Sequence, residues 1–286
     1  MRLMRVGTPG GERPVLYAPD GRHYDLTPLT DDLTPEFFAG DGPTRVAAAH
    51  ASGALPPAEV TGLRIAPPLA RPGAILCIGQ NYAAHAAESG SEPPTEPILF
   101  YKGPSSLAGP ADDVVIPPGS EQTDWEVELG VVIGRRAHRI TPDEDPLSYV
   151  AGYVLSNDVS ERAVQLGAPG GQWSKGKSAP TFNPLGPWLV TSDEIGDPQR
   201  LRLRSWINGE PRQDSTSADM IFPVAEIVRH LSRYLVLDPG DLINTGTPEG
   251  VALSGRFPYL RAGDVMELEI EGLGRHRNAL VAADPH

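Results

Sequence analysis

The sequence predicts an α+β fold that is mostly β. From residue 74 onward the apolar runs are short and rich in β-branched residues, and turn residues separate them, as strands require. Glycine and proline number 31 each, so 62 of the 286 residues favour turns. Helical spacing is found in only three stretches of this part of the chain. Strands and helices therefore do not alternate regularly, which argues against a doubly wound α/β fold.

The first 70 residues are expected to form a small N-terminal domain. They hold short apolar pieces at 15–17 and 24–26, separated by turn residues, and then a helical pattern over 44–52. Proline clusters at 55–57 and 66–73 follow. Because such clusters interrupt regular structure, we place a boundary near residue 70, with residues 71–286 forming the larger domain.

The larger domain carries the predicted strands and three helices. Short apolar runs predict strands over 75–78, 125–133, 150–155, 188–190, 201–207 and 265–270. Apolar residues at helical spacing predict helices over 82–89, 160–166 and 221–234.

Charge and cysteine content exclude several classes of protein. Lys and Arg number 24 against 37 Asp and Glu, a net charge of −13 that would repel nucleic acid and anionic membrane surfaces. The single cysteine, Cys77, lies in an apolar run and is expected to be a buried thiol. No signal peptide or membrane-spanning run is evident, so we expect a cytoplasmic protein. Motifs for nucleotide binding and serine hydrolysis are also absent from the sequence.

Three acidic residues form a candidate metal site. Strand residues alternate between faces, so Glu126 and Glu128 share one face of the strand predicted over 125–133. Asp158 follows the next predicted strand. Three oxygen ligands without cysteine or a nearby histidine suit Mg²⁺ or Mn²⁺ and do not suit zinc. The other interpretations are a solvated strand face for the glutamates and a helix N-cap for Asp158.

His85 and Glu88 form a candidate catalytic dyad. They lie three residues apart on the helix predicted over 82–89, which Asn81 would cap and Gly90 would end. A carboxylate that holds an imidazole raises its basicity, as a general base acting on water needs. Because short helices are marginal in water, this one could order over bound substrate as a lid. The other interpretation is a surface pair on an alanine-rich helix.

Two further segments could bind an acidic substrate. Lys175 and Lys177 lie in a glycine-containing loop, and residues 244–250 form a turn that would expose hydroxyl and backbone N–H groups. The other interpretations are a solvated lysine loop and an ordinary turn.

These segments occur together in a known pattern. From about residue 74 to 280 the chain resembles the fumarylacetoacetate hydrolase superfamily. The shared blocks are collinear: CIGQNYAAH (77–85), FYK (100–102), DWEVEL (124–129), SNDVSER (156–162), KGKS (175–178), GPWLVT (186–191), PGD (239–241) and TGTPEG (245–250).

The resemblance implies a rolled, mixed β-sandwich catalytic domain with a small N-terminal domain, in a homodimer. It implies Mg²⁺ or Mn²⁺ held by the three acidic residues, a water-activating dyad on a mobile lid, and a lysine facing the substrate. The implied residues are Glu126, Glu128 and Asp158 for the metal, His85, Glu88 and Lys177 for catalysis, and Tyr82, Arg162, Gln165 and Thr247 for the substrate pocket.

The blocks around 124–126, 160–162 and 172–177 are most similar to the branch that hydrolyses 2,4-diketo-3-deoxy sugar acids, beside the acylpyruvases. The implied reaction is hydrolysis of a carbon–carbon bond in a 2,4-dioxo acid. Decarboxylation of oxaloacetate, ureidoglycolate lysis, isomerisation or hydration of an unsaturated 2-oxo acid, and a non-catalytic binding protein are the alternatives. The chain departs from the family pattern at Gln80, at Gly103 and at Pro180.

Overall fold

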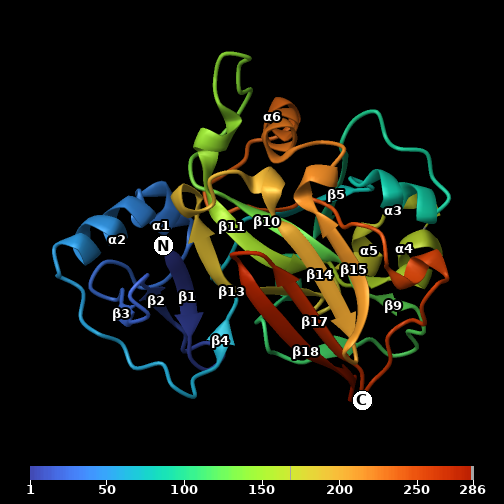
Figure 1. Ribbon diagram of the computed structural model, residues 1–286, viewed down its shortest axis with the longest axis horizontal. Coiled ribbons are helices and arrows are strands. Elements are labelled where there is room, and N and C mark those ends of the chain that lie inside the picture. The colour runs from blue at the N-terminus through green and yellow to red at the C-terminus, as the bar shows by residue number, and fades with distance from the viewer. Residues whose placement is uncertain (168, 285–286) are drawn as a thin grey trace.

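Two β-sheets packed face to face form the centre of the molecule, which the computed structural model describes for residues 1–167 and 169–284 (Figure 1). The larger sheet has eleven strands and the smaller five, and both mix parallel and antiparallel pairs. The predicted α+β, mostly β class and its mixed sandwich are confirmed. None of the helices in the described ranges has the length and apolar character needed to cross a bilayer.

The larger sheet runs in the order β3-β2-β1-β13-β11-β10-β16-β5-β6, with β4 beside β1 and β7 beside β13. Its strands are β1 (Arg2–Val6), β2 (Arg13–Tyr17), β3 (His23–Asp25), β4 (Ile65–Ala66), β5 (Ile75–Gly79), β6 (Ile98–Lys102), β7 (Leu107–Ala108), β10 (Val127–Ile133), β11 (Val150–Asn157), β13 (Asn183–Thr191) and β16 (Leu242–Asn244).

The smaller sheet runs in the order β15-β14-β17-β18-β8, and a two-stranded ribbon lies apart from both. The smaller sheet holds β8 (Val114–Ile116), β14 (Arg202–Ile207), β15 (Glu210–Thr216), β17 (Val265–Ile270) and β18 (Gly274–Ala282). The ribbon consists of β9 (Thr123–Asp124) and β12 (Ser160–Glu161).

Five of the six predicted strands differ from the structure in at least one bound, and two of them show a physical reason. The strand predicted over 125–133 begins at Val127, because a side chain takes the place of a backbone acceptor just before it: the N–H of Glu126 donates to Asn157 Oδ1. The strand predicted over 188–190 extends to Asn183–Thr191. Pro187 is tolerated there because it falls where the register with β11 is interrupted.

Within residues 1–167 and 169–284, six α-helices surround the sheets: α1 (Pro35–Ala39), α2 (Gly42–Ala51), α3 (Ala83–Glu88), α4 (Arg162–Gly167), α5 (Ser174–Lys177) and α6 (Val224–Tyr234). The helices predicted over 44–52, 82–89, 160–166 and 221–234 correspond to α2, α3, α4 and α6. Helix α6 begins later than predicted because Pro223 occupies its N-cap, and α4 begins later because Ser160 and Glu161 pair with β9.

The N-terminal strands extend the larger sheet, since β1 pairs with both β2 and β13. The helices α1 and α2 cover this sheet on the side where Phe38 and Val46 share a core with Val132 and Val154 (Figure 1). The boundary near residue 70 stays a prediction.

Strand β10 is buried on both of its faces. Leu129 and Val131 belong to the core between the two sheets, and Val132 belongs to the core under α1 and α2. Glu126 and Glu128 are only 4% and 1% exposed, so the interpretation of a solvated strand face is wrong. Any charge on these two side chains therefore needs partners inside the protein.

Candidate metal centre and active site

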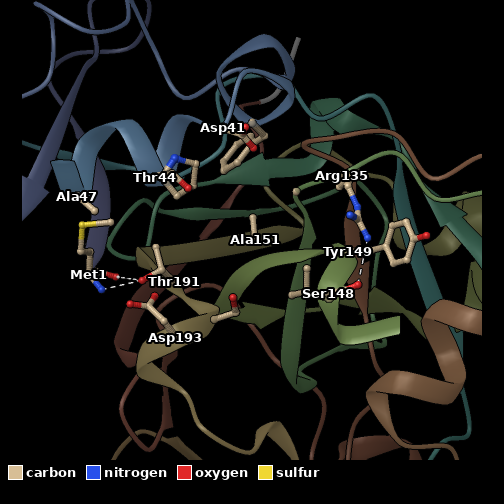
Figure 2. A pocket seen from close by; sticks show the side chains of 15 residues that line it. Met1, Asp41, Thr44, Ala47, Arg135, Ser148, Tyr149, Ala151, Thr191 and Asp193 are labelled. Atoms are coloured by element: carbon tan, nitrogen blue, oxygen red, sulfur yellow. Dashed lines mark hydrogen bonds between the residues drawn. The ribbon is translucent and has the colours of Figure 1, made fainter. Parts of the chain in front are cut away.

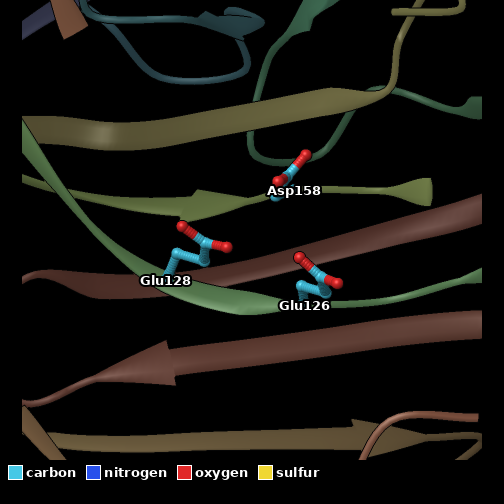
Figure 3. Close-up of side chains that lie close together, drawn as sticks. All are labelled: Glu126, Glu128 and Asp158. Atoms are coloured by element: carbon cyan, nitrogen blue, oxygen red, sulfur yellow. The ribbon is translucent and has the colours of Figure 1, made fainter. Parts of the chain in front are cut away.

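The structure brings the three predicted metal ligands together. Glu126, Glu128 and Asp158 are all buried, and each offers a carboxylate oxygen within 4.8 Å of the others (Figure 3). Figure 3 shows the three carboxylates directed toward one another, Glu128 from β10, Glu126 from just before it and Asp158 from just after β11. Such a cluster presents several oxygen atoms to one point in space.

Antiparallel pairing of β10 with β11 produces this cluster. Glu128 lies opposite Ser156, and the N–H of Asp158 donates to the carbonyl of Glu126 at 3.0 Å. The 30 residues between Glu128 and Asp158 are thus spanned by a strand pairing. Asp158 caps no helix, because α4 begins only at Arg162 and both oxygens of Asp158 accept from lysines.

Three buried cations surround the carboxylates. The Lys177 ammonium lies 2.7 Å from Glu126 Oε2 and 2.9 Å from Asp158 Oδ2. Lys102 Nζ lies 2.5 Å from Asp158 Oδ1. Arg162 Nη2 lies 2.7 Å from Glu126 Oε1, and its Nε donates to Asp124 at 2.8 Å. Lys177 is therefore a buried residue of the site, which excludes the solvated loop that was the other interpretation; Lys175 is exposed.

The same partners separate the pKa values of the two glutamates. Burial alone would raise the pKa of Glu126, but the charges of Lys177 and Arg162 lower it well below its usual range. For Glu128, burial and then the charges of Asp158 and Glu126 raise the pKa, against a smaller opposite effect of Lys177 and the Gly246 N–H. Among the described residues Glu128 forms no ion pair, and it is therefore harder to ionise than Glu126.

A divalent cation fits this donor set. The ligand atoms are all hard oxygens, as Mg²⁺ and Mn²⁺ prefer, and no cysteine or histidine belongs to the cluster among the described residues. A cation beside Glu128 would supply the positive charge that this buried carboxylate lacks.

His85 and Glu88 form a contact within α3. His85 Nδ1 lies 3.0 Å from Glu88 Oε1, and both side chains are largely buried, so the interpretation of a surface pair is wrong. Glu88 also accepts from the N–H of Gly250 at 3.0 Å. A proton on Nδ1 then donates to Glu88, which leaves Nε2 free to accept a proton. The mobility of this segment as a lid stays a prediction.

The predicted helix cap at Asn81 is wrong. The N-cap position of α3 is Tyr82, without a side-chain hydrogen bond to the helix. The Asn81 amide instead donates to the carbonyls of Phe222 and Thr245 and accepts from the N–H of Phe222. Distant backbone partners thus replace the local cap. Gly90 follows the helix end with a φ of +74°, as predicted.

The turn over residues 244–250 binds carboxylates of the protein itself. The N–H of Gly246 donates to Glu128 Oε2 at 2.8 Å, and the N–H of Gly250 donates to Glu88. The turn was expected to expose such groups to a substrate. It instead connects the acidic cluster to the dyad.

A cavity of about 120 Å³ joins these groups. His85, Lys177, Glu126 and Glu128 line it, and so do the predicted pocket residues Arg162, Gln165 and Thr247. Tyr82 does not line this cavity: it is buried in the core between the sheets, and its hydroxyl has no hydrogen-bond partner in the described part of the chain.

A larger hollow of about 480 Å³ lies elsewhere, between α2 and the ends of β11 and β13 (Figure 2). Met1, Thr44, Arg135 and Tyr149 are among its lining residues, and none of the predicted site residues is. The chemistry predicted from the sequence therefore belongs to the smaller cavity.

Comparison with known proteins identifies the family. A family model described as fumarylacetoacetate (FAA) hydrolase C-terminal matches residues 74–281. The chain belongs to the fumarylacetoacetate hydrolase family. It is also 48% identical over 280 residues to a 2,4-didehydro-3-deoxy-L-rhamnonate hydrolase of Sphingomonas sp. (strain SKA58), covering 97% of this chain and 95% of that protein.

Two solved structures extend the comparison. The fumarylacetoacetate hydrolase of the psychrophile Exiguobacterium antarcticum superposes with a TM-score of 0.83 at 32% identity, over 99% of this chain and 100% of that one. A 2-hydroxyhepta-2,4-diene-1,7-dioate isomerase of Mycobacterium marinum gives a TM-score of 0.72 at 29% identity, over 100% of both chains. The chain is an enzyme of this family, whose members similar to it include hydrolases and an isomerase.

Three residues of this site were assigned no role from the sequence. Lys102 ends the apolar strand β6, and Asp124 accepts from Arg162 and from the N–H groups of Ala252 and Leu253. Gln213, on the smaller sheet, donates to Thr247 Oγ1 at 2.8 Å. A lysine or glutamine at an inward-facing strand position was the signal that could have found Lys102 and Gln213.

The departures from the family pattern lie in different places. Gln80 lines the cavity, and its backbone has a φ of +53°. Pro180 is exposed and does not line the cavity. Gly103 also lies outside the cavity, and its N–H donates to Ser178 Oγ at 3.0 Å. Of the three departures, only Gln80 faces the site of chemistry.

Proposed function

We propose that this enzyme is a metal-dependent hydrolase that cleaves a carbon–carbon bond in a 2,4-dioxo acid, an acylpyruvate or a diketo-deoxy sugar acid. The observation that carries the proposal is one cavity lined by Glu126 and Glu128 of the acidic cluster, by His85 of the dyad and by Lys177. The name of the Sphingomonas relative, a hydrolase of a didehydro-deoxy sugar acid, supports it.

Glu126, Glu128 and Asp158 would hold the metal, Mg²⁺ or Mn²⁺. When bound, such an ion supplies Lewis acidity to the 2-oxo acid end of the substrate. Arg162 and Lys177 hold two of these carboxylates in place through their ion pairs.

The dyad would activate water. With Nδ1 held by Glu88, His85 takes a proton from water at Nε2, and the hydroxide adds to the C4 carbonyl. The bond between C3 and C4 then breaks. C4 leaves as a carboxylic acid and C3 receives a proton, giving pyruvate or a substituted pyruvate.

Lys177 would support the oxyanion at C4. Its ammonium has three N–H donors, and the two contacts to Glu126 and Asp158 leave one for the substrate. A buried donor of this kind stabilises developing negative charge strongly, because little water screens it.

A substrate panel tests the proposal. Purified enzyme is assayed with acylpyruvates, diketo-deoxy sugar acids, oxaloacetate and ureidoglycolate, with Mg²⁺ or Mn²⁺ and with chelator. We expect release of a 2-oxo acid and a carboxylic acid from the 2,4-dioxo acids, lost on chelation and in Glu126→Ala. Activity that survives chelation or this substitution would contradict the metal assignment.

The alternatives give other products in the same panel. The similar isomerase from Mycobacterium marinum favours isomerisation of an unsaturated 2-oxo acid as the second candidate. An isomerase would shift the ultraviolet spectrum of that acid without adding water, and a decarboxylase would release carbon dioxide from oxaloacetate. Binding without turnover of any substrate would indicate a non-catalytic protein.

We also propose that the enzyme acts as a cytoplasmic homodimer. The buried, unpaired Cys77 is compatible with a reducing compartment. Light scattering after gel filtration is expected to give twice the mass of the chain. A mass equal to that of one chain would contradict the dimer.

A further inference from the structure

We propose that Gln80 and Ser91 form a subsite that selects substrates with a hydroxyl group on the tail beyond the cleaved bond. This inference rests on the proposed function, because that function defines which end of the substrate is the tail. Both residues line the cavity that holds the acidic cluster.

The strand register places Gln80 across the cavity from the metal cluster. Gly130 on β10 lies beside Asn244 on β16, which lies beside Cys77 on β5. When both pairings are continued by two residues, they align Glu128 with Gly246 and Gly246 with Gly79. The N–H of Gly246 indeed donates to Glu128. Two strand spacings separate Gly79 from Glu128, about 10 Å. Gln80, the next residue after Gly79, is thus distant enough from the cluster to contact the far end of a bound acid.

The backbone of Gln80 is held in a conformation that side chains rarely adopt. Its φ is +53°, in the left-handed region. The following residue, Asn81, is held by hydrogen bonds from its side-chain amide to the backbone carbonyls of Phe222 and Thr245. Such conformations persist where neighbouring contacts enforce them, and they are frequent at ligand sites. The fixed backbone positions the Gln80 side chain at the cavity.

The pair keeps unused hydrogen-bonding groups. Gln80 Nε2 donates to Ser91 Oγ at 2.9 Å. The Gln80 carbonyl oxygen then remains as an acceptor and the Ser91 hydroxyl as a donor; with the amide reversed, the pair still keeps a free donor and a free acceptor. A hydroxyl group can donate and accept at once, so it satisfies both, whereas an alkyl group satisfies neither.

The other lining residues differ from the pair in the hydrogen-bonding groups they offer. Ile78, Phe100, Leu166, Trp173 and Leu253 are apolar over most of their surface. Ser89 Oγ donates to backbone carbonyls of its own helix. Gln165 Oε1 accepts from Arg162, which leaves Gln165 with its Nε2 donors.

Trp173 closes the side of the cavity next to the pair. A Cβ at Gly79 would lie 2.3 Å from Trp173 Cζ3, so only glycine lets the indole pack there. Next to this indole, Gln80 and Ser91 together offer both a hydrogen-bond donor and an acceptor to a bound molecule.

Two acids that differ by one hydroxyl group test the subsite: 2,4-dioxohexanoate and 5-hydroxy-2,4-dioxohexanoate. With Mg²⁺ present, kcat/KM is measured for the unmodified enzyme, Gln80→Leu, Ser91→Ala and the control Gln172→Leu, whose exposed glutamine lies outside the cavity. Leucine is no more branched at Cβ than glutamine, so the backbone strain at position 80 is unchanged. His85→Ala is also introduced into each of these four proteins, and the binding of both acids to the resulting proteins is measured by calorimetry.

We expect the unmodified enzyme and the control to prefer the hydroxylated acid by about tenfold or more in both measurements. Gln80→Leu and Ser91→Ala should reduce the ratio between the two acids toward one. Neither substitution should weaken binding or turnover of 2,4-dioxohexanoate, which lacks the hydroxyl group. An unchanged preference in both variants, or no preference in the unmodified enzyme, would overturn the subsite. Absence of turnover with a retained binding preference would instead contradict the proposed reaction and leave the subsite supported.

Discussion

Replacing Glu128 by glutamine should stabilise the metal-free enzyme and destabilise the metal-loaded one. The Glu128 carboxylate is buried beside Asp158 and Glu126, and burial and these charges raise its pKa well above the usual 4.5. The folded protein therefore binds this proton more tightly than the unfolded chain does. The resulting stability is fully present below about pH 4.5 and is lost as the pH rises through the raised folded pKa.

Linkage sets the size of the effect. Each pH unit between 4.5 and the raised pKa of Glu128 costs the metal-free enzyme about 1.4 kcal/mol of unfolding free energy. A glutamine does not titrate, and its amide oxygen can still accept from the N–H of Gly246. Removal of about 1.4 kcal/mol of this destabilisation, the amount for one pH unit, should raise the melting temperature by about 3 °C.

Bound metal should reverse the order of stability. Saturation at 100 times the dissociation constant adds about 2.7 kcal/mol to the enzyme that binds. Glu128→Gln lacks one of the three carboxylate ligands and should lose most of this gain.

Thermal melting between about pH 5 and 8, in chelator and in excess Mg²⁺, measures both effects. Glu210→Gln, at an exposed position on β15, is the matched control and should change neither. The reasoning would be refuted if Glu128→Gln melted below the unmodified enzyme in chelator throughout this pH range. It would also be refuted if Mg²⁺ raised the melting temperature of both enzymes equally.

Three further predictions concern the same site. Lys102→Met leaves the buried Asp158 without one of its two cations and should cost about 3–5 kcal/mol in urea denaturation, whereas Lys175→Met on the surface should cost under about 0.5; equal costs would contradict the buried pair. His85→Ala should lower hydrolysis by about 10²- to 10⁴-fold and keep calorimetric Mg²⁺ binding; near-normal hydrolysis would exclude His85 as the base. Hydrogen exchange in α3 should slow when oxalate is added with Mg²⁺, and unchanged exchange would count against a lid.

The acidic cluster could be predicted because its geometry follows from local rules. Strand alternation places Glu126 and Glu128 on one face, and the pairing of β10 with β11 brings Asp158 beside them. The His85–Glu88 contact follows from helical spacing alone. Each of these relations extends over one element or one strand pairing.

The remaining contacts depend on pairings that no local pattern encodes. Lys102 reaches Asp158, 56 residues away, and Gln213 reaches Thr247 from the second sheet. Asn81 has the residue type of a helix cap but bonds backbone groups more than 140 and 160 residues away. Packing around a short polar side chain decides whether it forms a hydrogen bond to a local or to a distant backbone group. The sequence shows only the local hydrogen-bond partner.

Burial of the cluster also changes what the net charge of −13 means for an acidic substrate. The acidic cluster and its ion-pair network contain four carboxylates and three cations: Asp124, Glu126, Glu128 and Asp158 against Lys102, Arg162 and Lys177. Fully ionised, this group carries one net negative charge, and a divalent cation would make it one net positive. Surface charges are screened within about 8 Å at physiological ionic strength, whereas buried ones are screened much less. The attraction that an anion meets in the cavity is therefore set by these few groups, so a small acid can bind to a protein whose surface repels it.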